Sequence, residues 1–356
     1  MSVPFPQPSI EADPEFMAHP FLAEGGEHRV FMYGGTNDIK LSVLQDLPLS
    51  SDTVLKFVLG ELVACNAGIE PPYLVESWRI ATAHAAERNK RYARLAQVFG
   101  RHTLGQLSQP MYVTLGEQTA AKLHPFAPHV SKGSQVSIVA TFQPLVRDLL
   151  LPAAERKTTS LHLPYVEYGE VESSCYARIT DKWLTNPTPP TDKEIEEFTA
   201  LYSDSPLRHF LYRSSIKRLA SLGDYTEDAI QYSRLTREIL DIAGPDNVIF
   251  GDDYLLVDAL FPSSCQHIDL VPSIIKRVQA GWGLSHREKI TLLNGLGYMR
   301  VMNFLAALFE LPERIDSMIG SAIHEQTWKN VHTALSTLPR PHMLNGPTQI
   351  YRSKTE

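Results

Sequence analysis

The sequence has little cysteine, and the arrangement of its cysteines excludes several kinds of site. The 3 cysteines among 356 residues are Cys65, Cys175 and Cys265. They are far apart and odd in number, and none belongs to a CxxC pair. This spacing excludes a disulfide scaffold, the usual structural zinc site and a CxxC redox centre within the chain. We therefore expect a protein that works in the reducing cytoplasm.

Long apolar runs and basic runs are also missing. No stretch approaches the ~20 apolar residues that a membrane-spanning helix needs. The chain has 33 Lys and Arg against 40 Asp and Glu, a net charge of -7, and a mildly acidic chain without a basic run binds nucleic acid poorly. The proline-rich residues 1–8 lack the basic-then-apolar layout of a secretory signal. We expect neither nucleic acid nor a membrane as a partner.

The sequence does contain enough apolar residues for a sizeable core. Hydrophobic residues make up 43% of the chain, which at this length predicts one large or two small packed units. Residues 186–190 are the clearest linker, because their prolines favour an extended backbone. The expected parts are an irregular lead-in at 1–25, a mixed but mostly helical unit at 26–185, the linker at 186–190, a helical unit at 191–338 and a loose tail at 339–356.

The first half mixes strand and helix patterns. Residues 136–151 fit either a helix or a strand followed by a helix, and the pattern alone does not choose between them. The other expected elements are strands at 29–33, 111–114 and 160–163 and helices at 51–68 and 73–99.

After the linker, apolar residues recur with helical spacing almost throughout, so we predict a mainly α protein. Thr191 with Glu194, and Ser285 with Glu288, have the form of a capping box at a helix start. The expected helices lie at about 191–201, 206–221, 225–243, 253–261, 269–281 and 284–309, with a short one opened by Pro312 and a last one at 321–338.

The segment 284–312 carries a recognisable pattern. Its residues are Leu284-Ser-His-Arg-Glu288, Leu292-Leu293, Gly297-Tyr298, Arg300, Asn303 and Leu311-Pro312. The pattern resembles the last helices of the carboxymuconolactone decarboxylase and alkylhydroperoxidase-D-like (AhpD-like) superfamily, and the resemblance covers roughly residues 205–312. It implies an all-α bundle in the C-terminal half, a homo-oligomer, and a small-molecule pocket beside this helix.

One departure from that superfamily matters for function. Its peroxidase branch uses a CxxC motif with a nearby histidine. At the matching place this chain has Gly223-Asp-Tyr-Thr-Glu-Asp228, which contains no cysteine or histidine. A thiol peroxidase is therefore excluded, whereas a lyase, decarboxylase or isomerase that works with carboxylates, tyrosine and histidine is compatible with the change.

The helix at 284–309 is apolar enough to be buried on most sides, so its polar residues need partners. Arg300 and Asn303 are the expected substrate-binding residues, because a guanidinium suits a carboxylate or enolate. An internal ion pair is the alternative for Arg300. The expected catalytic residues are Tyr298 with Asp253 or His286 as acid or base.

The segment Gly244–Tyr254 has three interpretations. A short apolar run followed by Gly and paired carboxylates resembles the last strand of the α/β barrel in metal-dependent amidohydrolases, where Asp252 or Asp253 would bind metal or take a proton. Alternatively, both aspartates stabilise the start of a helix at Tyr254. As a third interpretation, together with Asp258 they form a DDx4D arrangement for magnesium.

Histidines on loops are the other candidate metal ligands. His124 and His129 flank a proline-stiffened loop, and His162 lies in a strand-like run. They would join Asp252 in a metal site, yet the HxH pair that opens the amidohydrolase barrel occurs nowhere in the chain. We therefore expect no bound metal.

These patterns lead to three hypotheses about function. The first is a cofactor-free enzyme that acts on a small organic acid or polyketide-like substrate by proton transfer, decarboxylation or rearrangement. The second is a metal-dependent hydrolase or decarboxylase of the amidohydrolase type. The third is a non-catalytic helical interaction protein.

Overall fold

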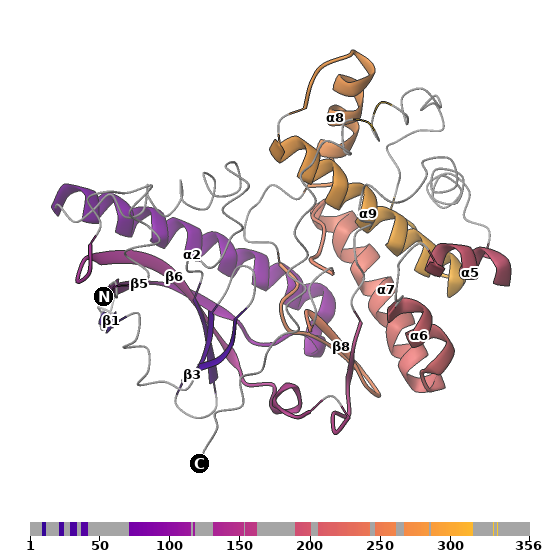
Figure 1. Cartoon of the computed structure of the whole chain (residues 1–356), viewed down its shortest axis with the longest axis horizontal. Helices are drawn as coiled ribbons and strands as arrows, with labels where there is room; N and C mark the ends of the chain where they lie inside the picture. Colours follow the sequence, from indigo (N-terminus) through magenta and orange to yellow (C-terminus); the bar gives the residue numbers. More distant parts are fainter. Residues whose placement is uncertain are drawn as a thin grey trace. The chain divides into compact units, whose positions relative to one another are not determined.

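The structure is a computed structural model of the whole chain (Figure 1), and it divides into two compact units. Unit 1 comprises residues 1–93, 105–150 and 342–356, and unit 2 comprises 94–104 and 151–341. The expected linker at 186–190 thus lies within unit 2. The residues described are 9–11, 21–24, 29–33, 37–41, 71–114, 117, 131–152, 154–161, 189–200, 206–242, 246–260, 267–284, 286–315, 330 and 333.

Unit 1 contains a six-stranded sheet with the strand order β1-β5-β6-β4-β3-β2. Strands β1 and β5 run parallel, and all other neighbours are antiparallel. The strands are β1 (Ser9–Glu11), β2 (Phe21–Glu24), β3 (Arg29–Tyr33), β4 (Asn37–Leu41), β5 (Leu107–Thr114) and β6 (Gln135–Pro144).

Several strand predictions are confirmed, and one expectation is corrected. Residues 29–33 and 111–114 form strands, and 136–151 is a strand followed by the 3-10 helix η3 (Arg147–Leu150). The lead-in at 1–25, expected to be irregular, holds β1 and β2, because its prolines lie outside both strands. Pro110 fits inside β5 because β1 pairs only with residues 112–114.

Helix α2 (Pro71–Phe99) confirms the long helix predicted at 73–99, and its first part lies along the sheet in Figure 1. Polar groups join the helix to the sheet. The Asn89 amide donates to the Ser108 carbonyl and accepts from the Ser108 N–H, both at 2.7 Å. The Ser108 and Thr141 hydroxyls then bond across neighbouring strands at 2.7 Å. Because the groups are paired, their burial costs little.

Unit 2 is mainly helical, as predicted for this part of the chain. Helices α7 and α8 both contact α9, and α5 contacts α6. The Thr191 and Glu194 capping box is confirmed, since each side chain bonds the other residue's backbone N–H. The helices are α5 (Asp192–Ala200), α6 (Pro206–Arg213), α7 (Ile216–Thr236), α8 (Leu270–Gln279) and α9 (His286–Leu308).

The predicted break near Gly223 is wrong. Helix α7 continues through Gly223, and the break lies at Ser214 and Ser215, where Ser215 caps the new helix by accepting from the Arg218 N–H. Gly223 is buried within this helix, and the Phe309 ring lies 3.5 Å from the place a Cβ would occupy, an ordinary van der Waals distance. This glycine therefore does not terminate the helix. The short helix expected from Pro312 is also wrong, because residues 311–315 are not helical.

A small antiparallel sheet replaces the helix predicted at 253–261. Strands β7 (Thr159–Ser160), β8 (Val248–Phe250) and β9 (Tyr254–Leu256) pair in that order. The apolar and aromatic residues 254–257 fit a buried hairpin as well as a helix, and pairing with β8 makes the segment a strand. Asp252 and Asp253 thus lie in a hairpin turn and not at a helix start or on a helical face. The described residues form no parallel barrel, which contradicts the amidohydrolase alternative for the fold.

Most of the described side chains of helix α9 are buried, as its composition predicts. Leu292, Val301 and Leu305 are at most 1% exposed, whereas Leu308 is partly exposed. No helix in the described parts of the chain is long and apolar enough to cross a membrane. The helix predicted at 51–68, and the side chain of Leu293, lie outside the described residues.

Replacing Gly295 with alanine is expected to destabilise unit 2 by about 1–2 kcal/mol, although alanine is the better helix former. A Cβ at Gly295 would lie 2.4 Å from Val271 Cγ2, and Val271 is fully buried and β-branched, so it cannot swing away. Denaturant unfolding measures the loss. The double variant Gly295→Ala with Val271→Ala should lose less than the sum of the single variants; simple additivity would disprove the close contact.

Candidate acid–base site

The predicted residue Tyr298 lies in the core of unit 2, where its hydroxyl is hydrogen-bonded within the protein. Its side chain is fully buried, and its hydroxyl bonds the Ser233 hydroxyl at 2.9 Å. Burial raises the pKa of the Tyr298 phenol, although the bond to Ser233 opposes the shift. In this structure the phenol therefore holds α9 to α7.

Asn303 is likewise engaged with the protein itself. It is 1% exposed, and its amide oxygen accepts from the Ile315 N–H at 2.9 Å. Its amide nitrogen donates to the Ile315 carbonyl at 3.3 Å. The side chain therefore ties the segment after α9 back onto that helix.

The other predicted residues are only partly described. Arg300 and His286 belong to α9, but their side chains lie outside the described residues, so their roles stay predictions. The same holds for the metal candidates His124, His129 and His162. Asp252 is described: its side chain is 82% exposed and pairs with Lys217 at 3.5 Å.

Asp253 is the predicted residue that the structure places among other titratable side chains. It lies in the turn between β8 and β9, where its Oδ1 accepts from the Tyr254 N–H at 3.0 Å. The same oxygen is 3.1 Å from His102 Nδ1, and Oδ2 is 2.9 Å from Arg101 Nη2. One carboxylate therefore contacts both an imidazole and a guanidinium.

Local backbone structure brings these residues together. Helix α2 is followed directly by the 3-10 helix η2 (Gly100–His102), which Gly100 enters with a positive φ of 53°. Thr103 then pairs with Leu256 in an isolated β-bridge, so η2 is held against β9. On the other side, the Gly251 N–H bonds the Asp253 carbonyl at 2.7 Å and closes the hairpin turn.

His102 is held in one orientation by two contacts with Tyr254. The imidazole stacks on the Tyr254 ring with centroids 4.1 Å apart and planes at 18°. Its Nδ1 donates to the Tyr254 carbonyl at 3.1 Å. Since Nδ1 faces a carbonyl and a carboxylate, it carries a proton, and Nε2 has no bonding partner among the described residues. The His102 side chain is 17% exposed.

Asp228 of α7 completes this cluster from another element. The Tyr254 hydroxyl donates to Asp228 Oδ2 in a short bond. Burial raises the pKa of the Asp228 carboxyl; the bond from Tyr254 and the nearby His102 oppose the shift, and Asp224 adds to it. Burial, with the contact to Asp228, also raises the pKa of the Tyr254 phenol, which therefore stays protonated and donates.

We name this group of residues the acid–base cluster: Arg101, His102, Asp228, Asp253 and Tyr254. All five belong to unit 2. It combines an imidazole, two carboxylates and an exposed guanidinium, which suits proton transfer on an anionic molecule. No group of three or more His, Cys, Asp or Glu that could hold a metal ion occurs among the described residues.

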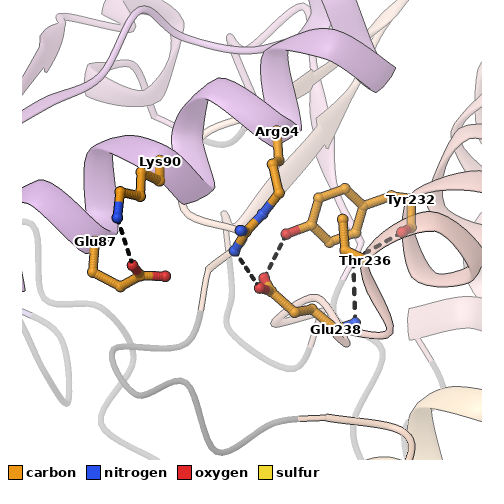
Figure 2. A network of polar contacts seen from close by, with 6 residues as sticks. All are labelled: Glu87, Lys90, Arg94, Tyr232, Thr236 and Glu238. Atoms are coloured by element: carbon orange, nitrogen blue, oxygen red, sulfur yellow. Dashed lines mark hydrogen bonds and ion pairs between the residues drawn. The ribbon is translucent and has the colours of Figure 1, made fainter.

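A second polar network in unit 2 joins Arg94 to α7 and the segment after it (Figure 2). Arg94 Nη2 donates to Glu238 Oε1 at 2.5 Å, and the Tyr232 hydroxyl donates to Oε2 at 2.7 Å. Glu238 is 4% exposed, and its N–H bonds Thr236 Oγ1 at 3.1 Å. Both carboxylate oxygens are thus occupied within the protein, which makes this network structural.

Sequence reasoning proposed Asp253 but missed its partners His102 and Arg101, and it missed Asp228, which accepts from the Tyr254 hydroxyl. No motif marks His102, which follows a helix end in Gly-Arg-His-Thr and lies 152 positions from the residue its Nδ1 contacts. Asp228 ends the segment Gly223–Asp228, which the sequence marks only by the absence of cysteine and histidine. Comparison with known proteins adds no assignment: no family model, no curated protein and no solved structure matches the chain.

Proposed function

We propose that the chain is a cofactor-free enzyme of the lyase or isomerase class that moves a proton on a small organic acid. The observation that carries the proposal is the Asp253 carboxylate between Arg101 and His102, at 2.9 Å and 3.1 Å. Asp253 orients the imidazole, as a carboxylate does in other acid–base sites. His102 Nε2 then gives or takes the proton.

Arg101 supports the choice of an organic acid as substrate. Its side chain is 82% exposed, so its guanidinium remains accessible to a carboxylate from solution while it lies beside Asp253. A planar, permanently charged fork matches a carboxylate better than an ammonium does. Decarboxylation or rearrangement, including that of a polyketide-like acid, would use the same proton transfer after the acid is bound.

Replacing His102 with glutamine is expected to lower turnover by about 10²–10⁴-fold, the usual contribution of a general acid or base. Turnover is followed by ¹H NMR in D₂O with a panel of small 2-oxo and 3-oxo carboxylic acids, as deuterium exchange or loss of carbon dioxide. Arg101→Met should mainly raise KM, because it removes a charge that binds the acid.

The matched control is His267→Gln, a histidine of the same unit outside the acid–base cluster, and it should keep wild-type turnover. Circular dichroism confirms that each variant is folded. Equal turnover in wild type and His102→Gln, or no turnover of any acid by wild type, would refute the proposed function.

The proposal also includes the type of helical bundle, the oligomeric state and the cellular location. Contacts of α7 and α8 with α9 support an AhpD-like bundle in the C-terminal half. The resemblance of residues 205–312 to that superfamily adds a homo-oligomeric state. The scattered cysteines support a cytoplasmic location.

A further inference from the structure

Asp228 and His102 lie on two sides of one tyrosine. The His102 imidazole covers the face of the Tyr254 ring at a centroid distance of 4.1 Å, and the Asp228 carboxyl accepts from the hydroxyl of the same ring. His102 comes from η2, Asp228 from α7 and Tyr254 from β9. Three separate elements thus hold an imidazole and a carboxyl against the same tyrosine side chain.

We propose that Asp228 is the second proton-transfer group of the site, a base that works together with a protonated His102 on a small 2-oxo acid. This inference rests on the proposed function and adds a residue, a division of roles and a substrate class to it. Tyr254 is a positioning residue that orients both groups.

The surroundings of the two side chains favour Asp228 as the base and His102 as the acid over the opposite assignment. Asp253 lies 3.1 Å from His102 Nδ1 and fixes the orientation of the imidazole, and its other oxygen pairs with Arg101. Asp228 is half-buried, and burial together with Asp224 one turn earlier raises the pKa of its carboxyl, which makes it a stronger base than an exposed aspartate. The Tyr254 hydroxyl and His102 limit that rise.

The proton transfers balance without any co-reactant. Asp228 takes a proton from the carbon next to the carbonyl, and the electron pair of that C–H bond forms the carbon–carbon double bond of the enol. The carbonyl oxygen takes the proton of His102 Nε2. The proton on the Asp228 carboxyl exchanges with the solvent, so in D₂O it is replaced by a deuteron. Reversal of both transfers then returns the oxo acid, now deuterated at that carbon, and restores both side chains.

The test uses the full chain and 2-oxobutanoate as the probe, with exchange of its C3 hydrogens in D₂O followed by ¹H NMR. Asp228→Asn keeps the shape of the side chain but removes the base, so exchange should fall by about 100-fold or more. Glu227→Gln removes a neighbouring exposed carboxylate of α7 and should leave the rate within about twofold of wild type.

The pH–rate profile of Tyr254→Phe distinguishes a positioning role of Tyr254 from a purely structural one. The hydroxyl lowers the pKa of Asp228, so its loss should raise that pKa. Because the base must be deprotonated, the acid limb of the pH–rate profile should move to higher pH. An unmoved limb would overturn the positioning role.

The outcomes separate this inference from the proposed function. Exchange that is lost in both Asp228→Asn and His102→Gln supports both. Exchange that persists in Asp228→Asn but is lost in His102→Gln overturns the role of Asp228 and leaves the proposed function intact. A wild-type enzyme that acts on other acids but does not exchange 2-oxobutanoate overturns the substrate class, and one that acts on no acid overturns both.

Discussion

Replacing Arg94 with methionine is expected to lower the free energy of unfolding by about 3 kcal/mol. The change leaves the Glu238 carboxylate, whose side chain is 6% exposed, without the guanidinium that lies 2.5 Å away. Losing one partner of a buried ion pair costs ~3–5 kcal/mol, and the partial exposure of Arg94, 38%, places this pair at the lower end. Chemical denaturation followed by circular dichroism measures the loss.

The same helix offers a matched control, drawn beside Arg94 in Figure 2. Lys90 pairs with Glu87 at 3.7 Å, but both side chains are well exposed, at 72% and 49%. Lys90→Met should therefore change the stability by less than about 0.5 kcal/mol. Similar losses from Arg94→Met and Lys90→Met would show that burial of Glu238 does not set the strength of its ion pair.

Replacing Asn303 with alanine is expected to cost about 2–4 kcal/mol of stability, because it leaves buried backbone groups unpaired. The Asn303 side chain satisfies both the N–H and the carbonyl of Ile315, and both residues are 1% exposed. Thermal and denaturant unfolding of the variant measure the effect.

This variant also separates the two roles assigned to Asn303. The sequence predicted a substrate-binding residue, whereas its contacts in the structure are with Ile315. If the contacts with Ile315 are its role, Asn303→Ala loses stability and the folded fraction keeps its KM. A stable variant with a raised KM would instead restore Asn303 to the substrate site.

Secondary structure was predictable where the pattern is long and local. Helices α2 and α9 follow from sustained helical spacing of apolar residues, and the start of α5 follows from Thr191 and Glu194 three positions apart. One error, the break predicted near Gly223, lies inside the long helix α7, and the others fall on short segments. Residues 254–256 suit a helix as well as a strand, and only pairing with β8 makes them a strand.

In the candidate site, too, the sequence identified a residue marked by a local pattern but not the partners that lie far from it in the chain. Asp253 attracts attention in the sequence because paired carboxylates after a glycine are unusual. Its partner His102 carries no such signal, and a histidine after a helix end is common on protein surfaces. Likewise, Asn303 is a polar residue on a buried helix, which identifies it as partnered without saying whether the partner is substrate or backbone.

The sequence by itself determined the mainly helical character of the second half and the need of Tyr298 and Asn303 in α9 for polar partners. Each depends on residue types or on spacings within one or two helical turns. Only the tertiary structure decided that Asp253 meets His102 and Arg101, and that Tyr254 joins His102 to Asp228. Those contacts form between elements far apart in the chain, and their geometry depends on how the whole of unit 2 packs.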